Sequence, residues 1–180
     1  MNRHYIEVGG RMKKLIIVNG TMGVGKTTIC NELLKCIPNS VFLDGDWCWN
    51  MNPFVVTDET KSMVMNNITH LLRNFLNCSI YDTVIFCWVI HQNEILNEIL
   101  DSLQGLSFTP HVFTLDITRE ALIKRLQMDV ENGIRTGDVI ERSLQRLELY
   151  QTMHTIKIDV SEISAKQAAE EIIELYHSKG

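Results

Sequence analysis

Hydrophobic and polar positions along the chain follow two alternating patterns. Short, nearly unbroken apolar runs are typical of strands that are buried on both faces of a parallel sheet. Between these runs, apolar residues recur at three- and four-residue spacing, which is typical of helices. The alternation predicts an α/β fold with a five-stranded, mostly parallel sheet. We expect the strands at Lys14–Val18, Ser40–Leu43, Thr83–Ile90, His111–Asp116 and Thr155–Val160.

Start and stop residues bound the helical segments. Pro38 cannot continue the helix that precedes it, and Asp58 is expected to cap the longest helix. The polar, glycine-containing stretch Glu131–Gly137 should interrupt the helical region after the fourth strand, so we expect a small helical lid at about residues 127–138. The expected helices are Lys26–Cys36, Asp58–Asn77, Glu94–Leu103, a helix from Thr118 onward, Asp138–Met153 and Ala165–His177.

The segment Leu15–Asn31 carries the most specific motif of the chain. Between a predicted strand and a predicted helix, Gly20, Gly25, Lys26 and Thr27 fill the pattern GxxxxGK followed by Ser or Thr, which is a phosphate-binding P-loop. Glycines let backbone N–H groups turn toward an anion, and the helix N-terminus adds partial positive charge. Lys26 is expected to contact the β- and γ-phosphates, and the Thr27 hydroxyl to ligate Mg²⁺. The expected nucleotide-binding residues of the loop are Gly20, Met22, Gly23, Val24, Gly25, Lys26, Thr27 and Thr28.

Two acids follow the second predicted strand in the string Asp44-Gly45-Asp46. In open α/β sheets, ligands lie outside the carboxyl ends of the strands, so both carboxylates should reach the same edge as the P-loop. Asp44 is expected to support Mg²⁺, and Asp46 to orient or deprotonate a hydroxyl nucleophile as a catalytic residue. An ordinary solvated Asp-Gly turn is the alternative for this string.

Other residues at this edge are candidates for contact with a phosphate acceptor. Trp47 and Trp49 follow the two acids and could stack on a base or sugar, with buried packing as the alternative. His91 follows the third strand, where a hydrogen-bonded structural histidine is the alternative. Arg135 lies in the expected lid and should close over the transferring phosphoryl group. A solvated helix face is the alternative for each arginine after the fourth strand.

Two other classes of P-loop protein fit the sequence less well. Many P-loop ATPases place an acid at the end of an apolar strand, whereas the third predicted strand ends in His91, so a motor-type ATPase is disfavoured. The strings Lys157-Ile158-Asp159 and Ser164-Ala165-Lys166 resemble guanine-reading motifs. They lie too close together to occupy successive strand-end loops, so we reject a GTPase.

Composition limits the cellular location and the classes of partner that we expect for the protein. The 180 residues are expected to form a single domain, with residues 1–11 as a short N-terminal extension that lacks the apolar core of a signal peptide. A formal net charge of −5 argues against a nucleic-acid partner, and no apolar run is long enough to cross a membrane. The five scattered cysteines form no CxxC pair, so we expect reduced thiols and a cytoplasmic location. The sequence is compatible with a monomer or a homodimer.

Together these motifs resemble the P-loop small-molecule kinases, a group that includes shikimate, gluconate and adenylylsulfate kinases and chloramphenicol phosphotransferase. The string LDGD at Leu43–Asp46 is similar to that of adenylylsulfate kinases. TLDITREALIKR at Thr114–Arg125 and QRLELY at Gln145–Tyr150 resemble the fourth strand, the lid-entry helix and the post-lid helix of shikimate kinases. The resemblance implies a three-layer α/β/α P-loop NTPase fold with strand order 2-3-1-4-5. It also implies that adenine packs on Arg125, phosphates meet Arg135 and the acceptor meets Arg146.

The sequence therefore predicts ATP- and Mg²⁺-dependent phosphoryl transfer to a hydroxyl or phosphate of a small-molecule acceptor. These motifs do not assign the identity of the acceptor, because Trp47–Pro53 matches none of these kinases and His91-Gln92 stands where shikimate kinases have a glycine pair. A nucleoside or nucleotide kinase is one alternative. An ATP-binding regulatory or resistance protein with weak ATPase activity is another.

Overall fold

The computed structural model describes residues 12–178, so the expected N-terminal extension over residues 1–11 lies outside the described residues. The strands are β1 (Lys13–Asn19), β2 (Ser40–Asp44), β3 (Thr83–Trp88), β4 (Phe108–Asp116) and β5 (Ile156–Asp159). The α-helices are α1 (Lys26–Cys36), α2 (Asp58–Asn77), α3 (Asn93–Ser102), α4 (Arg119–Glu131), α5 (Val139–Leu147) and α6 (Ala165–Ser178). Short 3₁₀ helices are η1 (Gly45–Trp49) and η2 (Glu148–Thr152).

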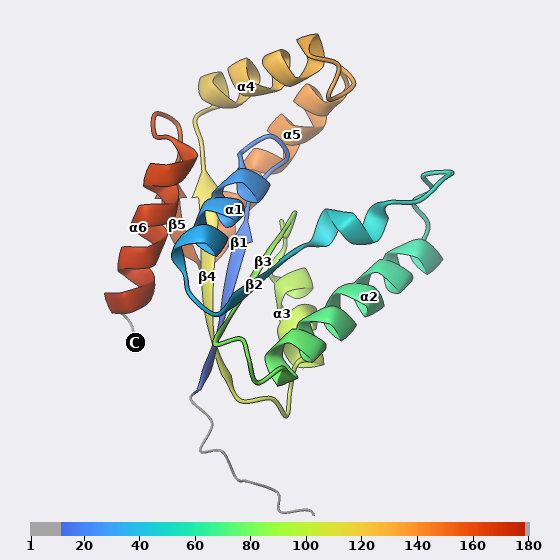
Figure 1. Ribbon diagram of the computed structural model, residues 1–180. Coiled ribbons are helices and arrows are strands. Elements are labelled where there is room, and N and C mark those ends of the chain that lie inside the picture. Colours follow the sequence, from blue (N-terminus) through green and yellow to red (C-terminus); the bar gives the residue numbers. More distant parts are fainter. Residues whose placement is uncertain (1–11, 179–180) are drawn as a thin grey trace, which may run out of the picture.

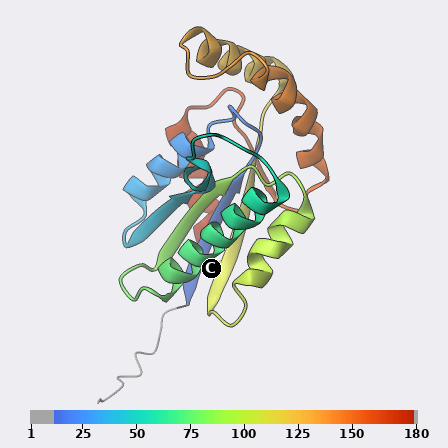
Figure 2. The same ribbon diagram turned by 90° about the vertical axis from the view of Figure 1, so that its right-hand side faces the viewer.

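The strands form a parallel sheet with the order β2-β3-β1-β4-β5. Helices α1 and α6 cover one face of this sheet, and α2 and α3 cover the other (Figures 1 and 2). Helices α4 and α5 lie beyond the carboxyl edge of the sheet (Figure 1). Parallel strands need crossover connections, and the helices in these connections, together with α6 after the last strand, supply both covering layers. The predicted three-layer fold and strand order are therefore confirmed.

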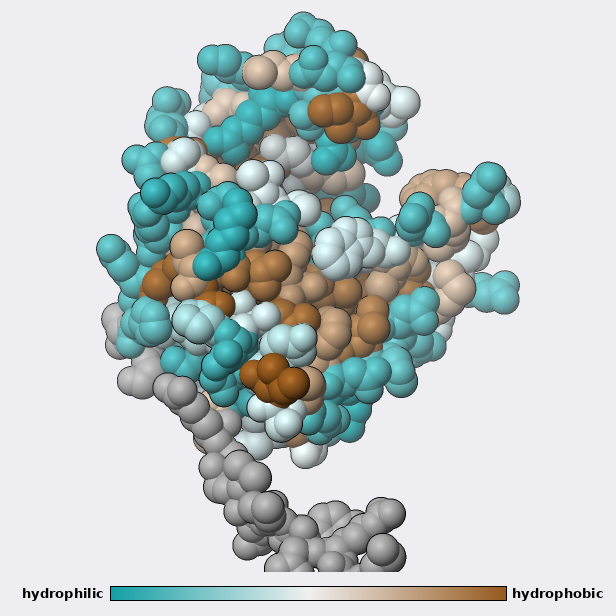
Figure 3. Space-filling view, viewed as in Figure 1, coloured by the Kyte–Doolittle hydropathy of each residue, from teal (hydrophilic) through white to brown (hydrophobic). Residues whose placement is uncertain are grey.

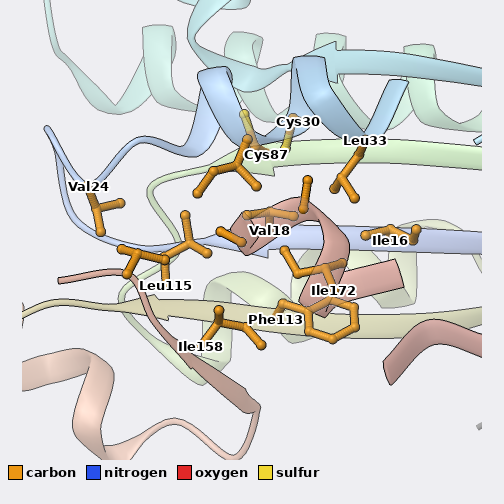
Figure 4. Close-up of a cluster of buried hydrophobic side chains, with 14 of the residues drawn as sticks. Ile16, Val18, Val24, Cys30, Leu33, Cys87, Phe113, Leu115, Ile158 and Ile172 are labelled. Carbon is orange, nitrogen blue, oxygen red and sulfur yellow. The ribbon is translucent and has the colours of Figure 1, made fainter. Parts of the chain in front are cut away.

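The central strand β1 sends alternate side chains into the two layers. Leu15 and Ile17 join the apolar cluster under α2 and α3, whereas Ile16 and Val18 join the cluster under α1 and α6. All four side chains are fully buried. Figure 4 shows the second cluster, where Ile16 and Val18 lie near Ile172 of α6. Burial on both faces explains why the strand is an apolar run instead of an apolar–polar alternation.

The third strand is shorter than expected, because β3 ends at Trp88 and not at Ile90. Its two neighbours end at the same level: Asp44 of β2 pairs with Cys87, and Asn19 of β1 pairs with Trp88. Beyond Trp88 neither neighbouring strand extends far enough to pair with the chain. The end of β3 therefore lies at the same edge as the P-loop and the two acids.

Two other segments also differ from expectation. β4 begins at Phe108 and not at His111, because β1 is long enough to pair with these additional residues. The expected helix Asp138–Met153 ends early and continues as the 3₁₀ helix η2. The tighter winding of η2 repeats every three residues, which suits the burial of both Tyr150 and Met153.

The bounds of every other expected strand and helix match the structure to within one residue at each end. The expected cap of the longest helix is wrong, because Thr57 and not Asp58 caps α2, through a hydrogen bond from the Thr60 backbone N–H to its side chain. No helix within residues 12–178 is both long and apolar enough to span a lipid bilayer.

Candidate active site

The loop between β1 and α1 folds around Lys26. The Lys26 ammonium donates hydrogen bonds to the carbonyl oxygens of Gly20 and Thr21, both at 2.9 Å. Burial of the side chain lowers the pKa of Lys26, while the nearby carboxylates of Asp46 and Asp44 raise it. A buried cation that bonds to neutral carbonyls keeps most of its charge available, so this loop favours an anion.

Both helices beyond the sheet edge contact the P-loop. Gly23 has a φ of +80°, and a Cβ there would lie 2.4 Å from Leu126 Cδ2 of α4, so the position requires glycine. From α5, the carbonyl oxygen of Ser143 accepts a hydrogen bond from Thr21 Oγ1 at 2.9 Å. We call α4, α5 and the intervening turn, residues 132–138, the lid helices. The phosphate loop is thus packed between the sheet and the lid helices.

Thr27 and Asp44 form a compact pair of oxygen ligands. The Thr27 hydroxyl donates a hydrogen bond to Asp44 Oδ2 at 2.6 Å. Asp44 Oδ1 accepts a second bond from the backbone N–H of Asp46 at 3.0 Å, which holds the buried carboxylate in place. Within residues 12–178, no group of three or more His, Cys, Asp and Glu side chains could hold a metal ion. A hydroxyl with one carboxylate suits Mg²⁺, which usually takes its other ligands from phosphate and water.

Asp46 lies in η1 and packs against the end of β3. Gly45 permits this approach, because a Cβ on Gly45 would lie 2.6 Å from Trp88 Cγ. The Trp88 side chain lies beside the Asp46 carboxylate and lowers its pKa, and an indole can act on a carboxylate only as an N–H donor. Burial raises the pKa of Asp46, although Lys26, Arg135 and the bond from Trp88 oppose this rise. A carboxyl with a raised pKa in a cleft is a candidate for proton transfer.

Arg125 of α4 is engaged within the fold. Its guanidinium donates hydrogen bonds to the carbonyl oxygen of Val24 in the P-loop, at 3.0 Å, and to that of Val160 after β5. Arg125 therefore joins the P-loop to the neighbouring strand-end loop. The contact with adenine that the family resemblance implies stays a prediction.

Two other arginines reach the site from the lid helices. Arg135 Nε forms an ion pair with Asp129 Oδ2 at 3.0 Å, so Arg135 is also held within the lid helices. Arg146 Nη1 lies 3.6 Å from the Met22 sulfur.

His91 lines the same cleft. Burial and the Arg146 charge both lower the pKa of His91, with burial as the larger cause, and the Val89 backbone opposes them. His91 is therefore neutral at pH 7.

One cleft of about 1340 Å³ brings most of the predicted residues together. Figure 3 shows a hollow between the lid helices and the projecting segment of residues 47–57. Lys26 is buried beneath the P-loop and is not part of the lining. The predicted residues that line the cleft are Met22, Thr27, Asp44, Asp46, Trp47, Trp49, His91, Arg135 and Arg146.

Trp88 and Phe54 are among the cleft residues that sequence reasoning missed. Trp88 belongs to an apolar run, so the pattern predicted a core position for it. The available signal was its place in the strand that follows the two acids, since strand ends of a parallel sheet meet at one edge. Phe54 lies in the segment between η1 and α2, where no motif marks it. Trp47 and Trp49, the two predicted tryptophans, lie in the 3₁₀ helix η1.

Comparisons with known proteins identify the family and the fold of this chain. Residues 16–146 match a family model, AAA_18, that is described as an AAA domain. Among proteins with curated descriptions, none has a sequence that matches this chain. Several solved structures share the fold over almost the full chain.

Three of these solved structures illustrate the similarity. A tunicamycin resistance protein from Deinococcus radiodurans has a TM-score of 0.65 and 23% identity, covering 91% of this chain and 95% of its own. A shikimate kinase from Acinetobacter baumannii, in complex with shikimate, has a TM-score of 0.63 and 20% identity, covering 93% and 94%. An APS kinase from Mycobacterium tuberculosis, in complex with AMPPNP and APS, has a TM-score of 0.63 and 16% identity, covering 92% and 98%. The chain therefore belongs to the AAA_18 family of AAA domains, with the fold of the P-loop small-molecule kinases.

Proposed function

We propose that the protein is a kinase that uses ATP and Mg²⁺ to phosphorylate a hydroxyl group of a small molecule. The observation that carries this proposal is the division between two neighbouring acids. Asp44 accepts hydrogen bonds from Thr27 and from the backbone of Asp46, which fixes it on the P-loop side. Asp46 lines the same cleft, but its carboxylate lies beside Trp88. We therefore assign Asp44 to Mg²⁺ and Asp46 to the acceptor.

The residues present fit a nucleoside triphosphate with its Mg²⁺. Lys26 holds a buried ammonium against neutral carbonyls at the mouth of α1, where backbone N–H groups also favour an anion. Thr27 and Asp44 supply the oxygen ligands that Mg²⁺ prefers. When bound, ATP supplies the phosphoryl group, and Mg²⁺ offsets the charge on its phosphates.

Asp46 acts on the acceptor hydroxyl in this proposal. The acceptor oxygen forms a bond to the γ-phosphorus while the bond from that phosphorus to the bridging oxygen breaks, and ADP leaves. The hydroxyl proton passes to the Asp46 carboxylate, which then releases it to solvent. Trp88 orients the carboxylate through its indole N–H, and Arg135 supplies positive charge from the lid helices.

Similar proteins support this class of reaction without assigning the acceptor. The named structures include kinases in complex with shikimate and with APS, which are chemically different molecules. The tunicamycin resistance protein favours a second candidate, an ATP-binding resistance protein with weak ATPase activity. The two candidates differ in one measurable property, because only a kinase needs an acceptor for rapid ATP turnover.

An acceptor screen that follows ADP release tests the proposal. Purified protein with ATP and Mg²⁺ is given nucleosides, sugars, polyols and hydroxyl-bearing antibiotics. We expect at least one compound to raise ADP release by about tenfold or more over the acceptor-free rate, and its mass to increase by one phosphate. The Lys26→Met variant serves as the inactive control. Slow ADP release that no compound stimulates would contradict the kinase and support the second candidate.

Replacing Trp88 with phenylalanine tests its role as a positioning residue. Phenylalanine keeps an aromatic ring against Gly45 but removes the donor to Asp46. Because this hydrogen bond lowers the pKa of Asp46, its loss should move the acidic limb of the kcat/KM profile to higher pH. We also expect kcat to fall by about tenfold.

The Trp49→Phe variant is the matched control for this experiment, since Trp49 lines the same cleft. It should leave the acidic limb in place. A fall in kcat with an unmoved acidic limb in Trp88→Phe would mean that Trp88 only fills space.

A further inference from the structure

We propose that the acceptor is a hydroxyl compound that carries an uncharged aromatic ring, and that this ring binds on the wall formed by η1 and the segment leading to α2. This inference rests on the proposed kinase function and names the class of molecule that it phosphorylates. It starts from side chains that the fold leaves exposed.

Three of the exposed large apolar residues line the cleft together. Trp47 is 57% exposed, Phe54 67% and Val56 54%, and all three line the cleft that contains Asp46. They lie within ten residues of the chain, outside both apolar clusters of the core. A contiguous exposed apolar patch on a protein of this size usually marks a binding site.

The rings of this wall are supported and not free. Trp47 packs edge-on against the buried ring of Phe42, with centroids 5.4 Å apart. Phe54 packs against Trp49 at 5.9 Å. Each exposed ring is therefore held by a second ring, and such supported rings offer pre-arranged surfaces for stacking. In Figure 3 the projecting segment shows pale-brown, hydrophobic surface beside the hollow, whereas the lid helices are mostly teal.

Charge separates the two sides of the cleft. Arg135, Arg142 and Arg146 come from the lid helices, and the family resemblance assigns phosphates to Arg135 and the acceptor to Arg146. The charged side chains that line the cleft from η1, α2 and α3 are Asp46, Asp58, Lys61 and Glu98. Lys61 is the one cation among these lining residues, and its Nζ lies 3.1 Å from Asp58 Oδ1. A carboxylate on the part of the acceptor that faces η1, α2 and α3 would therefore meet mainly acids, so we infer that the ring bound on this side is uncharged.

The size of the cleft agrees with two ligands. A volume of about 1340 Å³ exceeds the roughly 300–1,000 Å³ that is typical of a single ligand site. The space can hold a nucleotide together with an acceptor larger than a small polyol. A ring on the aromatic wall would leave the acceptor hydroxyl near Asp46, because both lie in the same cleft.

Matched acceptors test this inference. The panel contains 1-phenyl-1,3-propanediol, uridine, shikimate and gluconate, so that a simple aryl group, a nucleobase and two carboxylated polyols are compared. Two readouts are used, ADP release and quenching of intrinsic fluorescence. The three tryptophans of the chain all line the cleft, so their fluorescence reports binding there directly. We expect the two ring-bearing compounds to quench the fluorescence and to stimulate ADP release more than the carboxylated polyols.

Variants of exposed residues locate the ring without disturbing the core. Phe54→Ser should raise the KM or Kd of a ring-bearing compound about five- to tenfold, because stacking on aromatic side chains is lost. The adjacent Val55→Ser is the control, since Val55 is also exposed but does not line the cleft. Neither substitution should lower the melting temperature.

The outcomes separate this inference from the proposed function. Three results would overturn the inference. These are a preference for shikimate or gluconate over the ring-bearing compounds, equal effects of Phe54→Ser and Val55→Ser, and the absence of both quenching and turnover with the two ring-bearing compounds. Turnover of the carboxylated polyols would overturn it while supporting the kinase. Quenching by ring-bearing compounds without any ADP release would support the ring site and contradict the kinase. Stronger turnover of uridine than of the phenyl compound would identify the ring as a nucleobase.

Discussion

Replacing Lys26 with methionine is expected to reduce kcat for phosphoryl transfer by about 100- to 1,000-fold, the usual cost of removing one charged group from a pre-arranged anion site. Methionine keeps the length of the side chain but removes the ammonium that lies at the P-loop. The measurement is acceptor-dependent ADP release. Transfer at the wild-type rate would show that Lys26 is not part of the site.

The melting temperature distinguishes a loss of activity caused by the missing ammonium from one caused by unfolding. Burial lowers the pKa of Lys26 in the folded chain, so the charged form is less favourable there than in the unfolded chain. At pH 7, well below the ordinary lysine pKa of 10.5, the lowered pKa therefore costs folding free energy. We expect the melting temperature of Lys26→Met to equal or exceed that of the wild type. Lys35→Ala, an exposed position on the same helix, should change neither property.

Replacing Asp46 with asparagine should lower kcat by about 100- to 10,000-fold, the range expected for loss of a general base. The KM for ATP should change little, because Thr27, Asp44 and the P-loop hold the nucleotide side. Steady-state kinetics with varied ATP and saturating acceptor measure both parameters. Equal losses in kcat and in ATP affinity would remove Asp46 from the acceptor role. Asp58→Asn, at an exposed position on the same cleft, should leave kcat unchanged.

The pH profile gives an independent check on Asp46. Burial raises the pKa of this carboxyl above 3.8, so the base form should be lost as pH falls through a value above 3.8. The acidic limb of kcat/KM should therefore lie above that value, and it should vanish in Asp46→Asn. A raised pKa also means that the carboxylate costs folding free energy at neutral pH. The asparagine variant should be as stable as the wild type, or more stable.

Local patterns were enough to predict the elements of the fold. Strands buried on both faces need unbroken apolar runs, and this requirement predicted the central strand to within one residue at each end. The bounds of β3 and β4 were predicted less well, because their neighbouring strands determine them. β3 ends at Trp88 because its partners end at Asn19 and Asp44, and no property of the segment itself reveals where its partners stop.

The P-loop was predictable because its parts are contiguous. Lys26, Thr27 and the loop glycines all lie within eight positions, and their backbone geometry is set locally. The pairing of Thr27 with Asp44 followed from a topological rule, since strand ends of a parallel sheet meet at one edge. The aromatic wall was predictable only in part, because Trp47 follows the acids but Phe54 joins it through the path of the chain.

The sequence by itself determined a phosphate loop, two acids at the edge of a parallel sheet and arginines in the segment that follows β4. Each of these depends on short spacing or on a periodic pattern. Only the tertiary structure decided how they are held. Trp88 reaches Asp46, Leu126 packs on Gly23 and Arg125 bonds to Val24 and Val160. These contacts join residues that are 35 or more positions apart, and packing of the whole chain, rather than any local preference, brings them together.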